Sequence, residues 1–326
     1  RATAGHTWPR GRELTRRARR LWAASVGAVA ILLAGYLAAG SVLVMARHHR
    51  VPAPPEYLHG ESISLSSPSG ARLAAWLVVP ASPRGAVAVF HGVHASRSDM
   101  LGRTELLWRD GFAVLVPDLQ GHGESTGHRI TFGYREGMDV AACIEHLRTR
   151  FPDLRVGAVG VSLGGAALTL AAKRARPDAA VLEAVFPTIT EALDNRLAIR
   201  IGPLSRLLTP LLLLQLKPRL GIAPEDLRPI DEIGNLHCPT LVLSGTADRH
   251  TTEAQTRALH AAASDPKELW LVPGAGHVDL LRCDPRGYAA HVLGFLEKYL
   301  DTQGSGTRTP GLLAGAPRIA MRTTET

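Results

Sequence analysis

Short apolar runs and longer amphipathic segments alternate along the middle of this chain. The short runs have the length of β-strands, and the longer segments repeat their apolar residues every three to four positions, as α-helices do. The expected elements are strands at 62–66, 72–79, 86–90, 113–116, 156–161, 180–184, 240–244 and 268–272, and helices at 98–110, 138–150, 163–176, 252–263 and 286–300. Such alternation predicts an α/β fold: a mostly parallel sheet with helices on both faces.

The segment Phe186–Leu236 interrupts this alternation. Its prolines include Pro203, Pro210, Pro218 and Pro224, with leucine-rich stretches between them, which predicts short helices forming an inserted cap. Its leucines supply more apolar surface than one helix face buries, so we expect the cap to line a pocket for acyl groups. A packed core helix and a contact with a bilayer are the alternatives. These leucines are Leu204, Leu207, Leu208 and Leu211 to Leu214.

The N-terminal region contains a long uncharged run, Leu21–Ala46, of 26 residues. As a helix it would measure about 39 Å, enough to cross a hydrocarbon core of about 30 Å. Several arginines lie directly before it, which predicts a single-pass anchor with a cytoplasmic N-terminus and the remaining chain outside. A cleaved signal peptide, with a site of small residues near Ala38–Gly40, is the alternative, and it would give a secreted protein.

These features divide the chain into five parts. They are a basic arm (1–20), a transmembrane anchor (21–46), a proline-rich linker (47–60), a globular domain (61–301, with its cap at about 186–236) and a disordered tail (302–326).

The formal net charge of +8 comes from the two ends of the chain and from Arg47 and Arg50, which leaves 51–300 close to neutral. No basic stripe interleaved with aromatic residues is present, so we expect no nucleic-acid partner. Cys143, Cys238 and Cys283 are isolated and lack metal-ligand spacing, so we expect no metal. We interpret them as small buried hydrophobic residues, although one disulfide is also compatible with their number.

The sequence Gly160-Val161-Ser162-Leu163-Gly164 provides the first candidate for catalytic chemistry. It reads G-x-S-x-G between an expected strand and an expected helix. A serine at such a junction lies on a sharp turn with its hydroxyl projecting into the open. Ser162 is therefore the predicted nucleophile.

A serine hydroxyl needs a base that accepts its proton. Asp248 and His277 each follow an expected strand, and the chain order Ser162, Asp248, His277 is the one this architecture requires. We therefore predict a triad in which Asp248 orients His277. Asp279 is the rival acid, and His250 is the rival base.

Attack on a carbonyl develops an oxyanion, which requires positioned donors. The candidates are the backbone N–H groups of Leu163, at the start of the helix, and of Val93, in the loop after the 86–90 strand. His91 is expected to hold that loop in place. In the loop 118–125, Asp118 and His122 are expected to brace the chain near the pocket.

Together these blocks resemble the α/β-hydrolase superfamily over about 60–300. The chain is similar to the branch of lysophospholipases, monoacylglycerol lipases and serine aminopeptidases, and to membrane-anchored esterases with one N-terminal helix. It implies the α/β-hydrolase fold, a serine mechanism and no cofactor, since the triad suffices. The blocks that carry it are His91-Gly92, Asp118 to Ser125, Gly160 to Gly164, Asp248 and Gly276-His277.

The predicted function is cleavage of carboxylic esters through an acyl-enzyme, with acyl esters favoured. The substrate would be a small ester, lipid-derived esters included. A peptidase or acyltransferase using the same triad is the alternative among enzymes. A non-catalytic binding protein on a hydrolase scaffold is the alternative of another class.

Overall fold

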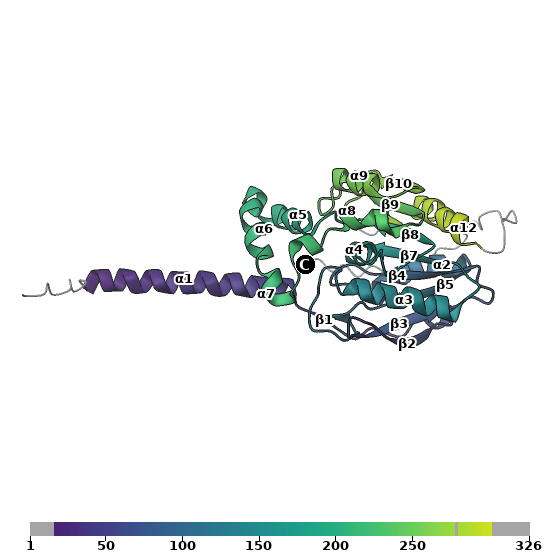
Figure 1. The fold of residues 1–326 in the computed structure, drawn as a ribbon, viewed down its shortest axis with the longest axis horizontal. Helices are drawn as coiled ribbons and strands as arrows, with labels where there is room; N and C mark the ends of the chain where they lie inside the picture. The colour runs from purple at the N-terminus through teal and green to yellow at the C-terminus, as the bar shows by residue number, and fades with distance from the viewer. Residues whose placement is uncertain (1–15, 278–279, 302–326) are drawn as a thin grey trace, which may run out of the picture.

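Eight strands form the central sheet of the computed structural model, which describes residues 16–277 and 280–301 (Figure 1). Their order across the sheet is β10-β9-β8-β7-β4-β5-β3-β2. The six strands from β10 to β5 pair in parallel, and β3 and β2 are antiparallel at one edge. The expected mostly parallel sheet is confirmed. Its strands are β2 (Glu61–Ser66), β3 (Arg72–Val78), β4 (Gly85–Phe90), β5 (Phe112–Pro117), β7 (Val156–Val161), β8 (Ala179–Glu183), β9 (Thr240–Gly245) and β10 (Lys267–Val272).

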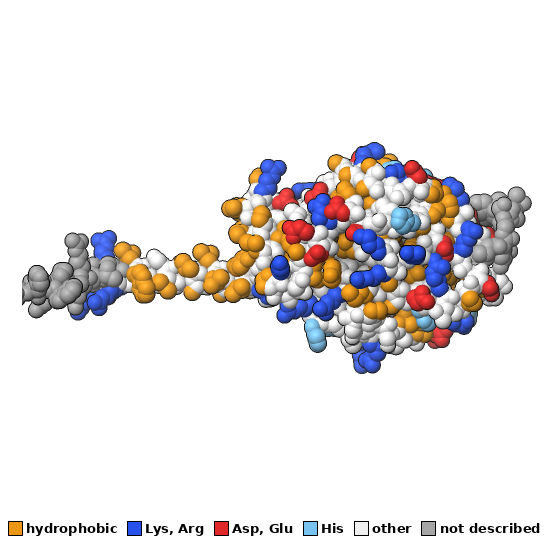
Figure 2. Space-filling view, in the orientation of Figure 1, with side chains coloured by type: hydrophobic (Ala, Val, Ile, Leu, Met, Phe, Trp, Pro, Cys, Tyr) orange, Lys and Arg blue, Asp and Glu red, His pale blue; other side chains and the backbone are white. Residues whose placement is uncertain are grey.

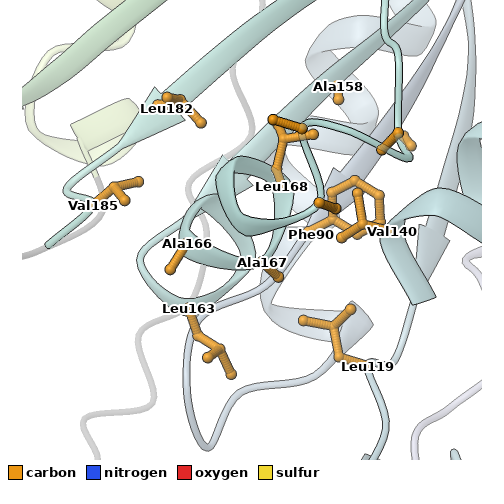
Figure 3. Packing of buried hydrophobic residues seen from close by; sticks show 14 of the residues in the cluster. Phe90, Leu119, Val140, Ala158, Leu163, Ala166, Ala167, Leu168, Leu182 and Val185 are labelled. Carbon is orange, nitrogen blue, oxygen red and sulfur yellow. The ribbon is translucent and has the colours of Figure 1, made fainter. Parts of the chain in front are cut away.

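Helices cover both faces of this sheet. One face packs against α3 (Glu136–Arg150), α4 (Leu163–Leu170) and α9 (Glu253–Ala262), and Figure 3 shows Leu168 of α4 close to Phe90 and Val140. The other face packs against α2 (Leu101–Arg109), a short helical turn α10 (Leu280–Cys283), α11 (Pro285–Tyr288) and α12 (Gly294–Leu300). Because both faces are covered, the central strands are continuous apolar runs, which is why they were recognisable in the sequence.

Several helices differ from the expected ranges. The helix expected over 163–176 ends at Leu170, and a series of turns leads to Pro177, whose ring disfavours a helical residue before it. The last expected helix is divided by a π-helical turn at Ala289–Leu293. Cys143 and Cys238 are buried as predicted, but Cys283 is exposed, because it lies in the surface turn α10.

The cap segment contains α5 (Ile189–Ile201), α6 (Ser205–Leu213), α7 (Leu216–Leu220) and α8 (Pro229–Glu232). Gly202 separates α5 from α6 with a φ of 59°, a conformation that glycine adopts without strain. The expected succession of short helices is confirmed.

The N-terminal helix α1 (Arg16–Leu43) extends away from the domain (Figure 1). By length and composition, Arg19–Leu43, with a mean hydropathy of 2.1, could cross a membrane. Ile189–Leu220 passes the same test, but it is the broken α5–α7 segment of the cap.

After α1 the chain contacts the domain at once: β1 (Arg47–His48) pairs with β6 (His122–Gly123), and Val44, Val51 and Leu58 are buried. The packed unit therefore begins near Val44, at the end of the predicted anchor, and it includes residues of the predicted linker 47–60. Residues 1–15 and the expected disordered tail 302–326 lie outside the described residues.

Candidate active site

Ser162 lies at the junction of β7 and α4, where the sequence predicts a sharp turn. Its φ of 50° and ψ of −108° are a conformation that non-glycine residues rarely adopt. Its backbone N–H donates to the Glu183 carbonyl at 2.8 Å, which fixes the turn against β8. This geometry matches the strand–turn–helix arrangement expected for an exposed nucleophile, although the side chain is itself largely buried.

The two glycines that flank Ser162 allow the chain to approach itself closely. A Cβ at Gly160 would lie 2.5 Å from the Gly165 Cα, and one at Gly164 would lie 2.5 Å from the Phe90 carbonyl oxygen. Both distances are shorter than any van der Waals contact. The G-x-S-x-G pattern is thus explained by the packing of α4 against β7 and β4.

This close approach gives a stability prediction. Gly160→Ala is expected to lower the free energy of unfolding by about 1–3 kcal/mol, because the added methyl meets backbone that cannot move aside. Gly294→Ala in α12 is the control, since its methyl meets no atom within 4 Å, and it is expected to raise that free energy by about 0.5–1 kcal/mol. Urea unfolding measures both variants. A Gly160→Ala protein as stable as the wild type would contradict the predicted clash.

Asp248 and His277 meet at the same edge of the sheet. His277 Nδ1 lies 2.7 Å from Asp248 Oδ2, and the Asp248 side chain is fully buried. Burial alone would raise the pKa of Asp248, but the hydrogen bonds from His277 and from the backbone N–H groups of Thr251 and His250 outweigh it and hold that pKa below its usual value. Asp248 therefore stays ionised beside the imidazole at neutral pH.

The position of this pair follows from strand order. Ser162 follows β7, Asp248 follows β9 and His277 follows β10, so all three lie at the carboxyl edge of one parallel sheet. A hydrogen bond of 2.9 Å from Ala247 N to Ala275 O joins the last two loops. In the part of the chain that the structure describes, Ser162 Oγ has no hydrogen-bond partner. Such bonds are often loose in structures without substrate.

The rival base, His250, lies beside the pair of His277 and Asp248 without an observed hydrogen bond from its ring to Asp248. The ring of His250 packs against that of His277, with centroids 4.8 Å apart, and burial, followed by the charges of His277 and Arg196, lowers the pKa of His250. The Asp248 carboxylate accepts from the backbone of His250, not from its ring. Asp279, the rival acid, lies outside the described residues.

The loop after β4 lies beside Ser162. A Cβ at Gly92 would be 3.7 Å from that of Ser162, so the loop that contains Val93 is a neighbour of the turn that contains Leu163. His91 is buried, its Nε2 accepts from Leu119 N at 3.0 Å, and burial lowers its pKa to about 4. His91 thus holds this loop as a neutral imidazole, the structural role expected for it.

The loop 118–125 braces the same edge. Asp118 is fully buried and accepts from the backbone N–H groups of Arg97 at 2.7 Å and Glu124 at 2.9 Å, and it forms an ion pair with Arg97. The rings of His122 and His91 are in edge contact, 5.0 Å between centroids. The expected structural role of this loop is confirmed.

A buried hydrogen-bond network around Glu183, next to the turn of Ser162, was not predicted from the sequence. Glu183 receives a bidentate pair of hydrogen bonds from Arg103, at 2.6 and 3.1 Å, and a third from the Tyr288 hydroxyl. Its carbonyl is the acceptor for Ser162 N. The only sequence signal was an acidic residue at the end of an apolar strand. This network ties the turn of Ser162 to helices on the far face of the sheet.

The cap contributes one cation near this edge. Arg196 of α5 is half-buried, and its positive charge acts on Asp248, His250 and His94. Among the described residues, its guanidinium donates only to Ala192 O, at 3.0 Å, and forms no ion pair. No group of three or more His, Cys, Asp or Glu side chains placed to hold a metal ion occurs between residues 16 and 301, leaving out 278 and 279.

Comparison with known proteins points in the same direction. Residues 81–229 match the family described as "Serine aminopeptidase, S33". An uncharacterized protein of Mycobacterium tuberculosis H37Rv is 28% identical over 224 residues, which cover 68% of this chain and 73% of that protein. The uncharacterized protein YqkD of Bacillus subtilis is 23% identical over 251 residues, covering 76% and 82%.

Solved structures show the fold. A Pyrococcus furiosus esterase superposes with a TM-score of 0.64 at 20% identity and covers 78% of this chain and 98% of its own. An α/β serine hydrolase without lid from Xanthomonas campestris superposes with a TM-score of 0.54 at 18% identity and covers 78% and 100%.

Proposed function

This chain belongs to the α/β-hydrolase superfamily, and from that premise we propose that it is a serine hydrolase of carboxylic esters, with acyl esters as its substrates. The observation that carries the proposal is the 2.7 Å contact of His277 Nδ1 with the buried Asp248 carboxylate, at the sheet edge where Ser162 occupies its strained turn. No cofactor is required for this chemistry.

In the proposed reaction, Ser162 Oγ attacks the ester carbonyl carbon while His277 Nε2 takes the hydroxyl proton. Asp248 keeps the other nitrogen of His277 protonated and stabilises the imidazolium. The N–H groups of Leu163 and Val93 would hold the oxyanion of the tetrahedral intermediate. His277 then gives its proton to the departing alcohol, which leaves Ser162 acylated.

Water completes the cycle. His277 removes a proton from the water that attacks the acyl carbon, and the second tetrahedral intermediate collapses to release the carboxylic acid. Ser162 recovers its proton from His277. Transfer to another acceptor in place of water would make the same site an acyltransferase.

An ester is favoured over an aminoacyl amide by the charge near the site. An aminopeptidase substrate carries a protonated amine, which needs carboxylates to receive it. The guanidinium of Arg196 acts on His250 and His94 at this edge and would repel a cationic substrate.

We propose further that α1 anchors the protein in a membrane, with the N-terminus in the cytoplasm and the hydrolase domain on the other side. Tyr36 and Gln215 are hydrogen-bonded, and Gly40 is buried against the Gln215 side chain. A signal cleavage near Ala38–Gly40 would remove these contacts, which supports retention of the helix over release of a secreted chain.

The substrate prediction is tested with matched acyl esters and aminoacyl amides. We expect a fluorophosphonate probe to label the wild-type protein, and short acyl p-nitrophenyl esters to be cleaved faster than aminoacyl p-nitroanilides. Arg196→Gln should reduce the ratio of ester cleavage to amide cleavage, because it should improve turnover of the cationic aminoacyl amides. Labelling without turnover of any ester would disprove the ester proposal, and faster amide cleavage by the wild type would favour the peptidase.

A further inference from the structure

The helix α6 of the cap carries its apolar stripe on the outside. Four leucines three or four positions apart are exposed: Leu204, just before the helix, by 52%, Leu207 by 65%, Leu211 by 43% and Leu214, just after the helix, by 68%. We refer to these four as the leucine ridge. They were expected to line an acyl pocket, but this spacing places them on one outward face.

The inward face of α6 is partly polar. Ser205 and Thr209 are buried, and Thr209 Oγ1 donates to Asp194 Oδ1 of α5 at 3.1 Å. A helix on the surface of a soluble domain turns its polar side to water. The opposite arrangement here, with contiguous exposed leucines, is typical of a surface that binds an apolar partner.

The leucine ridge lies next to the end of α1. The Tyr36 hydroxyl donates to Leu211 O at 2.8 Å, Gln215 Nε2 donates to Tyr36 O at 2.8 Å, and Arg219 Nη2 donates to Leu37 O at 2.6 Å. These contacts dock the last turns of α1 on α6 and α7. Figure 2 shows hydrophobic side chains that run along α1 and continue onto the edge of the domain where α6 lies.

These contacts also set the depth of α6. If the apolar run enters the hydrocarbon at Leu21, a core of about 30 Å is crossed in about 20 residues, that is, at Gly40. Tyr36 and Leu37 then lie within the last turns inside the core. The carboxyl end of α6 is level with them, and Figure 1 shows α6 running across the direction of α1. An amphipathic helix that lies in a membrane interface has this orientation and depth.

We propose that the leucine ridge is a membrane-docking surface, which enters the bilayer at the boundary where α1 leaves it. The exposed basic side chains of Arg200, Arg206 and Lys217 flank the ridge and suit lipid phosphates. The proposal rests on α1 as a membrane anchor and does not depend on the reaction catalysed. Because Asn195 of α5 donates to His250 O at 3.0 Å, docking also holds the candidate active site close to the lipid surface.

The test is the depth of spin labels in the full chain, reconstituted in nanodiscs of phosphatidylcholine and phosphatidylglycerol. Cys283→Ser removes the exposed thiol, while Cys143 and Cys238 are buried and do not label. Single labels are then placed with Leu207→Cys on the ridge, Leu32→Cys within α1 and Lys298→Cys on α12, and collision with oxygen and with a water-soluble nickel chelate is measured. Leu32 is well exposed on α1. Lys298 is well exposed on α12, which lies far from α1 (Figure 1).

We expect the ratio of oxygen to nickel collisions at Leu207→Cys to be several-fold higher than at Lys298→Cys and to approach that at Leu32→Cys. If the ratio of oxygen to nickel collisions at position 207 equalled that at position 298, while the label at position 32 lay deep in the bilayer, docking of the ridge would be overturned. The proposal that α1 is a membrane anchor would still hold. Equal ratios at all three positions would overturn both. A label at 207 shielded from both reagents, with dipolar broadening between labels, would show that the ridge binds a second copy of the chain instead of lipid. Ester hydrolysis by the same samples reports on the proposed function separately.

Discussion

Ser162→Ala is expected to lower kcat/KM for ester hydrolysis by about 10⁴-fold or more while the protein remains folded. The reason is chemical: no other group in the proposed mechanism supplies the attacking oxygen, and the residual rate comes from the oxyanion donors and binding alone. Ser162 Oγ makes no hydrogen bond to any described residue, so its removal leaves no buried partner unsatisfied. We expect the free energy of unfolding to change by less than about 0.5 kcal/mol.

Three measurements check this expectation: hydrolysis of a p-nitrophenyl ester, labelling by a fluorophosphonate probe, and urea unfolding. Ser264→Ala is the matched control, because Ser264 is an exposed serine that donates to Gly234 O far from the sheet edge. It should retain full activity and labelling. If Ser162→Ala kept more than a tenth of wild-type activity, the nucleophile would lie elsewhere.

The candidate site could be predicted from sequence because a parallel sheet fixes where strand ends meet. Once β7, β9 and β10 are recognised as buried strands, the residues that follow them must lie along one edge. Ser162, Asp248 and His277 each stand directly after such a strand or in the loop it begins. Local pattern therefore indicated a tertiary arrangement, and the 2.7 Å contact of His277 with Asp248 agrees with it.

Contacts between distant elements could not be predicted in this way. Glu183 meets Arg103 and Tyr288, which are 80 and 105 residues away and come from the other face of the sheet. Arg196 lies in the cap, whose path over the domain no local pattern specifies. For the four leucines of the ridge, the sequence composition indicated a large apolar surface but not that it faces outward. The direction depends on Thr209 pairing with Asp194 and on α1 docking beside Leu211.

The N-terminal boundary was misplaced for a related reason. Pro52, Pro54 and Pro55 favour an extended chain, and extended chain in a sequence resembles a linker. The same conformation also lies well against a domain surface, as it does at the buried Val51. Whether an extended segment is free or docked depends on the surface it meets, here β6 and its neighbours.

Asp248→Asn tests the orientation of His277, and we expect it to lower kcat by about 10⁴-fold with little change in fold. The Asp248 carboxylate accepts a hydrogen bond from the Nδ1–H group of His277, so Nε2 is free to take the proton of Ser162. An asparagine can turn its NH₂ toward Nδ1, which then becomes the acceptor, and the proton moves to Nε2, where the ring can no longer act as a base. The side-chain oxygen of asparagine still accepts from the backbone N–H groups of His250 and Thr251, which preserves the loop.

The matched control is Asp279→Asn, which replaces the rival acid and should reduce kcat far less than Asp248→Asn does. The tautomer change predicts a further signature. Fluorophosphonate labelling of Asp248→Asn should slow along with ester hydrolysis, because both need the same activated hydroxyl, whereas KM should change little, because Asp248 is buried away from the substrate. If Asp279→Asn proved the more damaging of the two, the 2.7 Å contact between Asp248 and His277 would be structural, and the acid of the triad would have to be reassigned.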